Sequence, residues 1–265
     1  MEIFDLPVQV FWGNRETLAL VIFEYMTVVA VGLGIMELAL TSVEGFNAGD
    51  PLPKVLMQRW TPIFVMQGFW WSYLGLLGMI PAWGQELGYM VSGWETISGG
   101  SVVEQGVDFG AALYDSMDWV PPVTMAGMVT LGVPLLVIGF FGYLGVYIGM
   151  WQIEMSILFI VGPFFVALGQ CRWGEGFFRV YLSDAFSLFV RLFMAHLIIS
   201  IGANLMPLIM ARVWAAETGT LKLMVSAAVA SVVFVIVAKN LPIKYGERVA
   251  SQLSLSFPKV FAEGR

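Results

Sequence analysis

Long apolar stretches alternate with shorter polar segments along the whole chain. Five stretches carry almost no charge over about twenty residues or more, the length that a helix rising about 1.5 Å per residue needs to cross a hydrocarbon core of about 30 Å. The expected crossings are residues 17–41, 60–80, 122–150, 184–210 and 221–241. The pattern predicts an all-α, polytopic helical membrane bundle in which residues 1–265 form a single membrane domain.

A sixth apolar stretch, residues 152–169, is too short to be assigned from its length alone. It follows the third crossing with almost no loop, contains Glu154 near its start and has Gly162-Pro163 halfway along. Because proline lacks an amide hydrogen and frees a carbonyl of the preceding turn, the Gly-Pro pair predicts a bent or re-entrant element. A full sixth crossing and an ordinary kinked helix stay open as alternatives.

The connection between the second and third crossings, residues 82–121, carries acidic residues but no lysine or arginine. Apolar residues recur within it at helical spacing, namely Val103, Val107, Ala111, Tyr114 and Met117. The opposite face is acidic and is the candidate for docking external partners through Glu104, Asp108, Asp115 and Asp118. The spacing predicts a short amphipathic helix on the external surface.

The distribution of lysine and arginine predicts the orientation, because these residues favour the cytoplasmic side of short loops. With five crossings and an external N-terminal segment 1–16, nine basic residues fall inside and three outside. The inner residues are Lys54, Arg59, Arg172, Arg179, Lys239, Lys244, Arg248, Lys259 and Arg265, and the outer ones are Arg15, Arg212 and Lys222. Six crossings give four inside and eight outside, or the reverse when inverted. Five crossings fit best, with the tail 243–265 in the cytoplasm.

Composition indicates lipid rather than water as the solvent. Hydrophobic residues make up 58% of the chain and charged residues 12%, with a mean hydropathy of +0.81, whereas roughly a quarter of the residues in a soluble domain are charged. Acidic residues outnumber basic ones by 19 to 13, so no strongly basic face is available to hold nucleic acid through its phosphates.

Catalytic and metal-binding classes find no support in the sequence. Cys171 is the single cysteine and His196 the single histidine, so the usual zinc clusters cannot form. The HExxH, Walker and GxSxG motifs are absent. The sequence therefore predicts a protein that is not an enzyme and that has neither a cofactor nor a metal site.

Four ionisable residues lie deep in predicted crossings: Glu24, Glu37, Arg191 and His196. Burying a charged side chain in hydrocarbon costs at least about 2.5 kcal/mol, so these groups must face protein or water. They either line a pathway or proton relay, or pair helices and subunits, and pairing is the favoured interpretation. If residues 184–210 run from inside to outside, Arg191 lies level with Glu37, which makes these two the predicted pair. His196 is expected to be neutral and hydrogen-bonded.

Glycines gather in the second half of the third crossing, at Gly139, Gly142, Gly145 and Gly149. Small residues let helix backbones approach closely, and Gly145-x-x-x-Gly149 has the spacing of a small-residue packing motif. These glycines predict a helix-packing or oligomer face. The sequence leaves open whether the contact is made within one chain or between subunits.

A series of features from Val103 to Arg191 resembles one known family. It begins with the acidic helix EQGVDFG (residues 104–110), which a long glycine-rich apolar span follows. Next come the segment EMSILFIVGPFFVALG (residues 154–169), an Arg172-Trp173 loop and a helix through Phe177, Tyr181 and Asp184. In this order they resemble the TrbL family of inner-membrane proteins from conjugative type IV secretion systems.

The resemblance implies a polytopic subunit of the bacterial inner membrane at the base of a periplasmic stalk, with a periplasmic N-terminus and a cytoplasmic C-terminus. The implied role is a platform for pilus and stalk assembly and for translocation of DNA or protein. The implied partners are membrane lipids, pilin, the minor pilin-like stalk subunit, other inner-membrane components of the secretion system and its ATPases, with transient contact to transferred DNA. A ring of identical subunits, with five copies as the expected number, would require a heterologous interface.

A stand-alone channel or secondary transporter is the alternative function. Its pathway would be lined by Glu24, Glu37, Arg191 and His196. Transporters commonly contain paired broken helices in two related halves. The sequence shows one candidate break and no inverted repeat, which favours the secretion-system interpretation.

Overall fold

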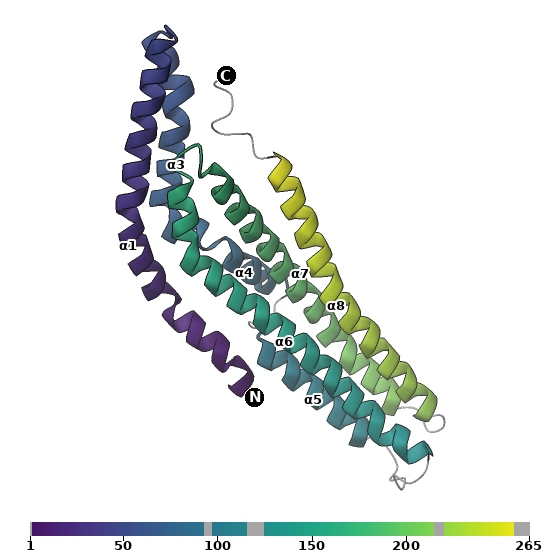
Figure 1. The fold of residues 1–265 in the computed structure, drawn as a ribbon. Coiled ribbons are helices and arrows are strands. Elements are labelled where there is room, and N and C mark those ends of the chain that lie inside the picture. The colour runs from purple at the N-terminus through teal and green to yellow at the C-terminus, as the bar shows by residue number, and fades with distance from the viewer. Residues whose placement is uncertain (1, 93–96, 116–124, 215–219, 257–265) are drawn as a thin grey trace. The chain divides into compact units, whose positions relative to one another are not determined.

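The computed structural model describes residues 2–92, 97–115, 125–214 and 220–256, and these residues form helices and short connections without a β-strand (Figure 1). The elements in chain order are α1 (Glu2–Asn47), α2 (Leu52–Lys54), the π-helical turn η1 (Val55–Trp60), α3 (Thr61–Trp71), the π-helical turn η2 (Tyr73–Leu77), α4 (Ile80–Ser92), α5 (Gly99–Asp115), α6 (Met125–Leu168), α7 (Glu175–Trp214) and α8 (Thr220–Ser256). The predicted all-α fold is confirmed.

Four helices are long and apolar enough to cross a membrane. They are Asp5–Asn47, Leu131–Leu168, Glu175–Gly202 and Val225–Gln252. A further crossing is available if the two parts of one bent pair, Leu52–Trp71 and Tyr73–Val91, count as a single span; they meet at a bend of 62°. The structure thus has the four to five long apolar helices of a polytopic membrane bundle.

Several helices extend beyond the predicted crossings. The segment 1–16, predicted as an external N-terminus, is helical from Glu2 and continuous with the first crossing. No proline interrupts the chain between Pro7 and Pro51, so nothing in the backbone chemistry ends the helix earlier. At the other end α8 continues to Ser256, while residues 257–265 of the predicted tail lie outside the described residues.

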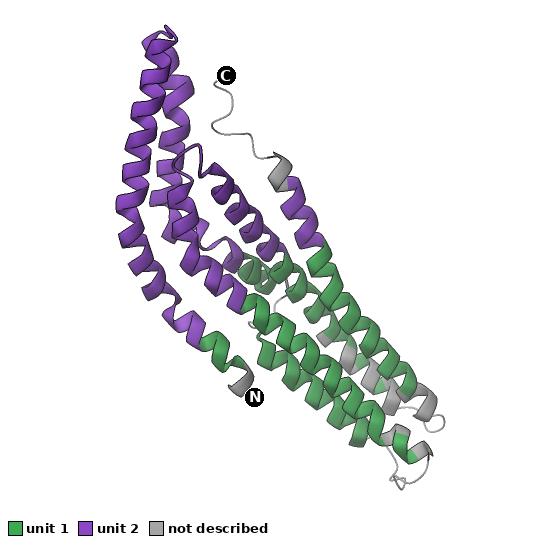
Figure 2. Cartoon of the chain, viewed as in Figure 1, with its two compact units in different colours: residues 1–9, 84–152, 191–244 green, residues 10–83, 153–190, 245–265 purple. Residues whose placement is uncertain are grey.

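The chain divides into two compact units (Figure 2). Unit 1 comprises residues 1–9, 84–152 and 191–244, and unit 2 comprises residues 10–83, 153–190 and 245–265. The helices α1, α4, α6, α7 and α8 each contribute residues to both units.

Apolar and aromatic side chains from α1, α3, η2, α4, α6 and α7 form the core of unit 2. Trp70 and Tyr73 are completely buried, and Phe23 of α1 stacks on Trp70 with the ring centroids 4.5 Å apart. The buried residues of this core are Ala30, Met66, Trp70, Tyr73, Leu77, Ile80, Val166, Ala167, Phe178, Tyr181, Leu182 and Ala185. Since lipid is as apolar as these side chains, close packing rather than exclusion from water holds such helices together.

Residues 152–169 are not re-entrant, because α6 runs without a break from Met125 to Leu168. The predicted third crossing and the short stretch after it are therefore one helix. Pro163 leaves the carbonyl of Phe159 without its amide donor, and the Tyr73 hydroxyl donates to that carbonyl at 2.7 Å. Gly162 leaves room for this ring, since a Cβ there would lie 2.7 Å from Tyr73 Cζ. A side chain from another helix thus satisfies the break without a reversal of the chain.

The bend of the chain lies instead in the predicted second crossing, residues 60–80. Here α3 ends at Trp71, and the chain continues through Ser72 into the π-helical turn η2, where the amide of Gly78 donates to the carbonyl of Tyr73 at 2.8 Å. An apolar run has the same hydropathy in an α-helix and in a π-helical turn. The sequence pattern therefore predicted one straight helix.

The predicted amphipathic helix is confirmed as α5, but Ala111 and Tyr114 of the predicted apolar face are exposed, and Met117 lies outside the described residues. Its buried side consists of Gly99, Gly100, Val102, Val103, Gly106, Phe109, Gly110 and Leu113. Glu104, Asp108 and Asp115 lie on the exposed side. Asp118, the fourth predicted docking residue, lies outside the described residues.

Glycines bring α5 against α6 within unit 1. A Cβ on Gly99 would lie 2.6 Å from the carbonyl oxygen of Gly145, and one on Gly110 would lie 2.5 Å from Cγ1 of Ile138. Gly106 faces Phe141 of α6 in the same way. These three glycines share one face of α5. At Gly99 the two backbones meet directly, whereas Gly106 and Gly110 leave room for the side chains of Phe141 and Ile138 of α6.

Candidate functional site

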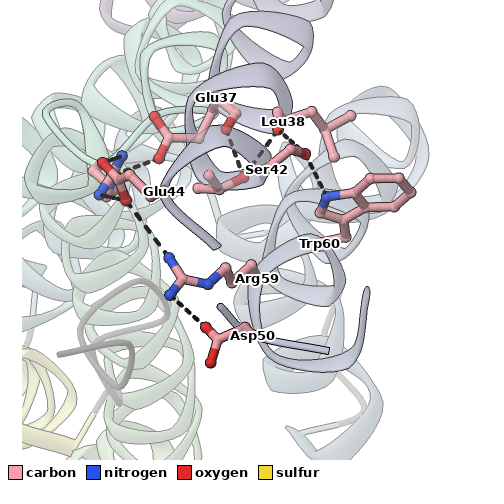
Figure 3. A network of polar contacts seen from close by, with 9 residues as sticks. Glu37, Leu38, Ser42, Glu44, Asp50, Arg59 and Trp60 are labelled. Atoms are coloured by element: carbon pink, nitrogen blue, oxygen red, sulfur yellow. Dashed lines mark hydrogen bonds and ion pairs between the residues drawn. The ribbon is translucent and has the colours of Figure 1, made fainter. Parts of the chain in front are cut away.

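Six charged side chains gather near the end of α1, within unit 2. Figure 3 labels four of them, Glu37, Glu44, Asp50 and Arg59. This charged network consists of Glu37, Glu44, Asp50, Lys54, Arg59 and Arg172. The residues come from the last turns of α1, from the segment that leads through α2 into η1, and from the turn between α6 and α7. Three carboxylates face three cations, so the network is balanced in charge.

The end of α1 determines where the acidic residues lie. Glu37 and Glu44 are two helical turns apart and therefore share one face. The helix ends at Asn47, and Gly49 two residues later has a φ of 72°, which suits glycine. The Gly49 amide donates to the carbonyl of Phe46 and the Asp50 amide to that of Gly45, both at 3.0 Å. These two bonds form a Schellman motif, which holds Asp50 beside the cations that follow it.

Arg172 joins the turn after α6 to the end of α1. Its Nε lies 2.5 Å from Oε1 of Glu37, and its two terminal nitrogens donate to the two oxygens of Glu44 at 3.0 and 2.9 Å. The planar guanidinium can hold one carboxylate with two parallel bonds while a third nitrogen faces another. Hydrogen bonding to Glu44 raises the pKa of Arg172, so this side chain stays charged.

Arg59 and Lys54 hold the carboxylate of Asp50. Arg59 donates to one oxygen of Asp50 at 2.9 Å, and Lys54 donates to the other at 2.7 Å. Arg59 also lies 3.7 Å from Glu44, which links this group to Arg172. The hydrogen bonds from Lys54 and Arg59 lower the pKa of Asp50.

Glu37 is the most deeply buried acid of the network. Its side chain is 1% exposed, compared with 35% for Arg172 and 49% for Glu44. A carboxylate so far from water needs a cation beside it, since an isolated buried charge is strongly disfavoured. Arg172 is that cation, which explains why the turn between α6 and α7 is fastened at this point.

The network has the chemistry of a clamp. Its carboxylates are all paired with cations, and it contains no cysteine, serine or histidine nucleophile. Among the described residues, no group of three or more His, Cys, Asp or Glu side chains is placed to hold a metal ion. The arrangement fixes the ends of three chain segments to one another.

The predicted pairing of Glu37 with Arg191 is wrong, because Glu37 pairs with Arg172. Arg191 lies in α7 within unit 1 and is half-buried. The depth argument placed Arg191 correctly inside a helix, but depth along a helix does not fix which way a side chain points. The sequence did contain one indication of a contact with Arg172. With five crossings, Glu44 and Arg172 are both predicted on the cytoplasmic side of the membrane.

The same contact bears on the alternative of six crossings. That alternative needs a separate crossing between the third predicted span and Arg172. In the structure α6 is one helix, and the arginine beyond its end contacts acids at the end of α1. The six-crossing alternative does not agree with this arrangement.

The other intramembrane candidates lie apart from the network. Glu24 is exposed on α1 and forms no ion pair among the described residues. His196 is buried in α7, where its Nδ1 lies 2.9 Å from the carbonyl of Leu192. Because a carbonyl only accepts, Nδ1 carries the hydrogen. Gly88 of α4 leaves room for this histidine, since a Cβ there would lie 2.5 Å from His196 Cβ.

The predicted glycine face divides into two parts. Gly145 contacts Gly99 and Val103 of α5, and Gly149 lies beside the same helix. Gly139 and Gly142 have nothing within 4 Å of the position that a Cβ would take. The first part makes the close contact within the chain, and the second part is open.

Glu154, at the start of the predicted re-entrant element, is exposed on α6. Gly162 and Pro163, predicted as the re-entrant turn, are buried inside the same continuous helix. Their role is therefore in packing within unit 2, against Tyr73 and Tyr181.

The helices define a multi-pass helical membrane protein in which the charged network joins segments of the chain. A comparison with protein families agrees with this class: residues 62–241 match the model of the TrbL/VirB6 plasmid conjugal transfer protein family. The match covers more than half of the chain, and the chain belongs to this family, as the resemblance in its sequence predicted. It is thus a component of a conjugal transfer or type IV secretion system. A search of curated proteins found no match.

Proposed function

We propose that this chain is an inner-membrane platform subunit of a conjugative type IV secretion system, on which stalk and pilus subunits assemble and past which DNA or protein crosses. Membership of the TrbL/VirB6 family supports the system. The four to five apolar crossings support a place within the bilayer. In this proposal the energy for transport comes from partner ATPases, and the charged network of this chain only holds its segments together.

The exposed acidic face of α5 carries this proposal. Glu104, Asp108 and Asp115 are exposed on it, while its glycine face is held against α6. A rigidly mounted helix that presents carboxylates attracts a partner with a basic surface, because complementary charges steer encounters. In the proposed orientation this partner is a periplasmic stalk or pilin-like subunit.

The orientation follows from the positive-inside rule. Lys54, Arg59 and Arg172, all assigned to the cytoplasm by the charge distribution, belong to one network in unit 2. Residues on the same side of the membrane can contact one another, so one shared network supports placing all three in the cytoplasm. The N-terminus is then periplasmic, and the described part of α8 leads towards the cytoplasm.

Assembly into a ring of identical subunits, five in our proposal, places apolar surfaces of α1 against neighbours or pilin. Of the four helices that can cross alone, α1 has the smallest buried share. Glu24 is exposed on it, and an ionisable group among lipid-facing residues favours a protein partner. The open glycines Gly139 and Gly142 offer a second contact face.

Neutralising the acidic face of α5 tests the docking role. The triple variant Glu104→Gln, Asp108→Asn and Asp115→Asn should reach the membrane at normal levels but lower plasmid transfer at least about tenfold, the effect of losing roughly 1.4 kcal/mol of binding. Glu86→Gln, which removes an exposed acid of α4, is the control and should transfer normally. Normal transfer by the triple variant would refute the docking role.

Thiol labelling tests the orientation. In a Cys171→Ser background, Glu104→Cys and Trp173→Cys place single thiols on two exposed sites. A membrane-impermeant reagent added to cells with a permeabilised outer membrane should label the first and leave the second protected until the inner membrane is opened. The reverse result would invert the proposed orientation, and labelling at both sites would contradict five crossings.

The transporter alternative gains no support from the fold. Among the described residues one helix pair is bent in the manner of a broken span, whereas transporters typically carry such elements in pairs. Glu37, one of its four proposed lining residues, is buried in the charged network.

A further inference from the structure

Pro163 lies inside α6 and leaves the carbonyl of Phe159 without its helical donor, while Pro81, in the first turn of α4, has no amide to offer to the carbonyl of Leu77 at the end of η2. In an α-helix the amide of residue i donates to the carbonyl of residue i−4, and proline has no such amide. Pro163 therefore cannot serve Phe159, and Pro81 cannot serve Leu77. Within a membrane an unsatisfied carbonyl is costly, because no bulk water is present to replace the missing donor.

Two buried tyrosines donate to these carbonyls. The Tyr73 hydroxyl donates to Phe159 O at 2.7 Å, and the Tyr181 hydroxyl donates to Leu77 O at 3.2 Å. The tyrosine side chains are almost completely buried, with residue exposures of 0% and 1%. Their hydroxyl oxygens lie 3.4 Å apart and their rings 5.9 Å apart. Two hydroxyl hydrogens thus serve the two carbonyls that the prolines leave open.

The two bonds connect three elements in sequence. Tyr73 lies in η2 and donates its hydroxyl hydrogen to a carbonyl of α6. Tyr181 lies in α7 and donates to a carbonyl of η2. The bend itself contains a π-helical turn with Gly75 and lies next to Ser72. Sharp bends in helices arise at π-helical turns and prolines.

We propose that Tyr73 and Tyr181 form a lock that holds the bend of the second crossing. Because the bonds come from side chains, a rotation of either hydroxyl releases one carbonyl without breaking a helix. Release of the Tyr181 bond frees the segment around Leu77, and release of the Tyr73 bond frees the bend from α6. The lock is therefore a conformational device that lets the bent pair move relative to α6 and α7 within unit 2.

A set of crossed double variants tests the lock on the full chain purified in detergent. Tyr73→Phe removes one donor and should lower the melting temperature by about 2–4 °C, the shift expected for the loss of about one hydrogen bond in a chain of this size. In a Pro163→Ala background the new amide of residue 163 serves Phe159, so Tyr73→Phe should cost almost nothing. The buried Cys171 is a built-in reporter, because a thiol-reactive dye labels it only on unfolding.

The matching pair is Tyr181→Phe in a Pro81→Ala background. Here too the cost of losing the hydroxyl should disappear. The exchanged combinations are the controls: Tyr181→Phe should keep its full cost in the Pro163→Ala background, and Tyr73→Phe in the Pro81→Ala background. If Tyr73→Phe does not fold alone, recovery of folding in Tyr73→Phe with Pro163→Ala supports the lock. Equal costs in all backgrounds would overturn it.

Hydrogen exchange separates a lock from a purely structural contact. Tyr181→Phe should raise amide exchange at least about threefold in residues 74–83, with little change in α8, and Pro81→Ala should restore the slow rate. Faster exchange spread evenly over the chain, or no change in the 74–83 segment, would overturn the assignment of a movable bend.

Discussion

Two helix contacts in this protein solve the same packing problem in opposite ways. In unit 1, α5 meets α6 through glycines, so that the carbonyl of Gly145 lies where a Cβ of Gly99 would fall. In unit 2, the turn after α6 is fastened to α1 by Arg172, which reaches both Glu37 and Glu44. The first contact depends on the absence of side chains, and the second on long polar ones.

The difference shows how each contact fails. Between glycine backbones no flexible atom can move aside, so any added carbon forces the helices apart. In the charged network the atoms can move, but a removed partner leaves a charge in a poorly hydrated place. Membrane helices lack a strong hydrophobic force for association, so both small residues and polar groups serve as contacts.

Enlarging the glycine contact should give the largest effect. Gly99→Val places side-chain carbons against the backbone of α6, which has no rotamer to change. We expect a loss of about 3 kcal/mol or more, at the upper end for overpacked sites. The measurement is the yield of monodisperse protein and its melting temperature in detergent.

The open glycines provide the matched control. Gly139→Val and Gly142→Val add the same carbons to α6 where no atom lies within 4 Å, and the melting temperature of the chain should stay nearly unchanged. A change in subunit number in these two variants alone would assign this part of the face to contacts between subunits. Equal damage from Gly99→Val and Gly139→Val would contradict the division of the face.

Removing Arg172 should give the next largest effect. Arg172→Gln leaves the buried carboxylate of Glu37 without its cation. We expect a loss of about 2–3 kcal/mol, below the about 3–5 kcal/mol for fully buried pairs, because water reaches part of the arginine. Thermal unfolding at neutral pH measures this loss.

The second substitution Glu37→Gln should recover much of it, since a neutral amide needs no cation. Glu44→Gln, at a half-exposed position, should cost less than about 1 kcal/mol, as is usual for exposed pairs. If Arg172→Gln and Glu44→Gln cost the same, Glu37 is not the residue that makes Arg172 important.

Acid should give the smallest effect, through Asp50. Its pKa is lowered in the folded chain by hydrogen bonds from Lys54 and Arg59. The stabilisation is therefore complete above the unfolded pKa of about 3.9 and is lost as the pH falls through the lower folded value. The difference in melting temperature between the native chain and Asp50→Asn should shrink below about pH 4. A difference that stays constant down to pH 2 would contradict the role of this carboxylate.

Much of the fold followed from hydropathy and spacing. The apolar runs predicted the crossing helices, and the periodicity around Val103 predicted α5 with Glu104 and Asp108 exposed, although it also placed the exposed Ala111 and Tyr114 on the apolar face. These features depend on residues close together in sequence, for which helix geometry alone decides which side chains share a face.

The errors concern contacts between distant segments. The Gly162-Pro163 pair predicted a bent or re-entrant element, whereas α6 continues through it because Tyr73 of η2 donates to the carbonyl that Pro163 leaves open. Glu37 was paired by depth with Arg191, whereas the real partner lies in the turn after α6. The position of a proline does indicate which carbonyl needs another donor. A tyrosine in a neighbouring apolar segment is then a candidate for that donor.

The length of α6 has a consequence for the boundary between lipid and protein. Its 44 residues measure roughly 66 Å at about 1.5 Å per residue. Even at a steep tilt of about 40°, a core of about 30 Å covers roughly 26 residues. The remaining turns stand outside the hydrocarbon although they are apolar. Apolar turns outside lipid are stable only under a protein cover, and α5 supplies such a cover where its glycines contact α6.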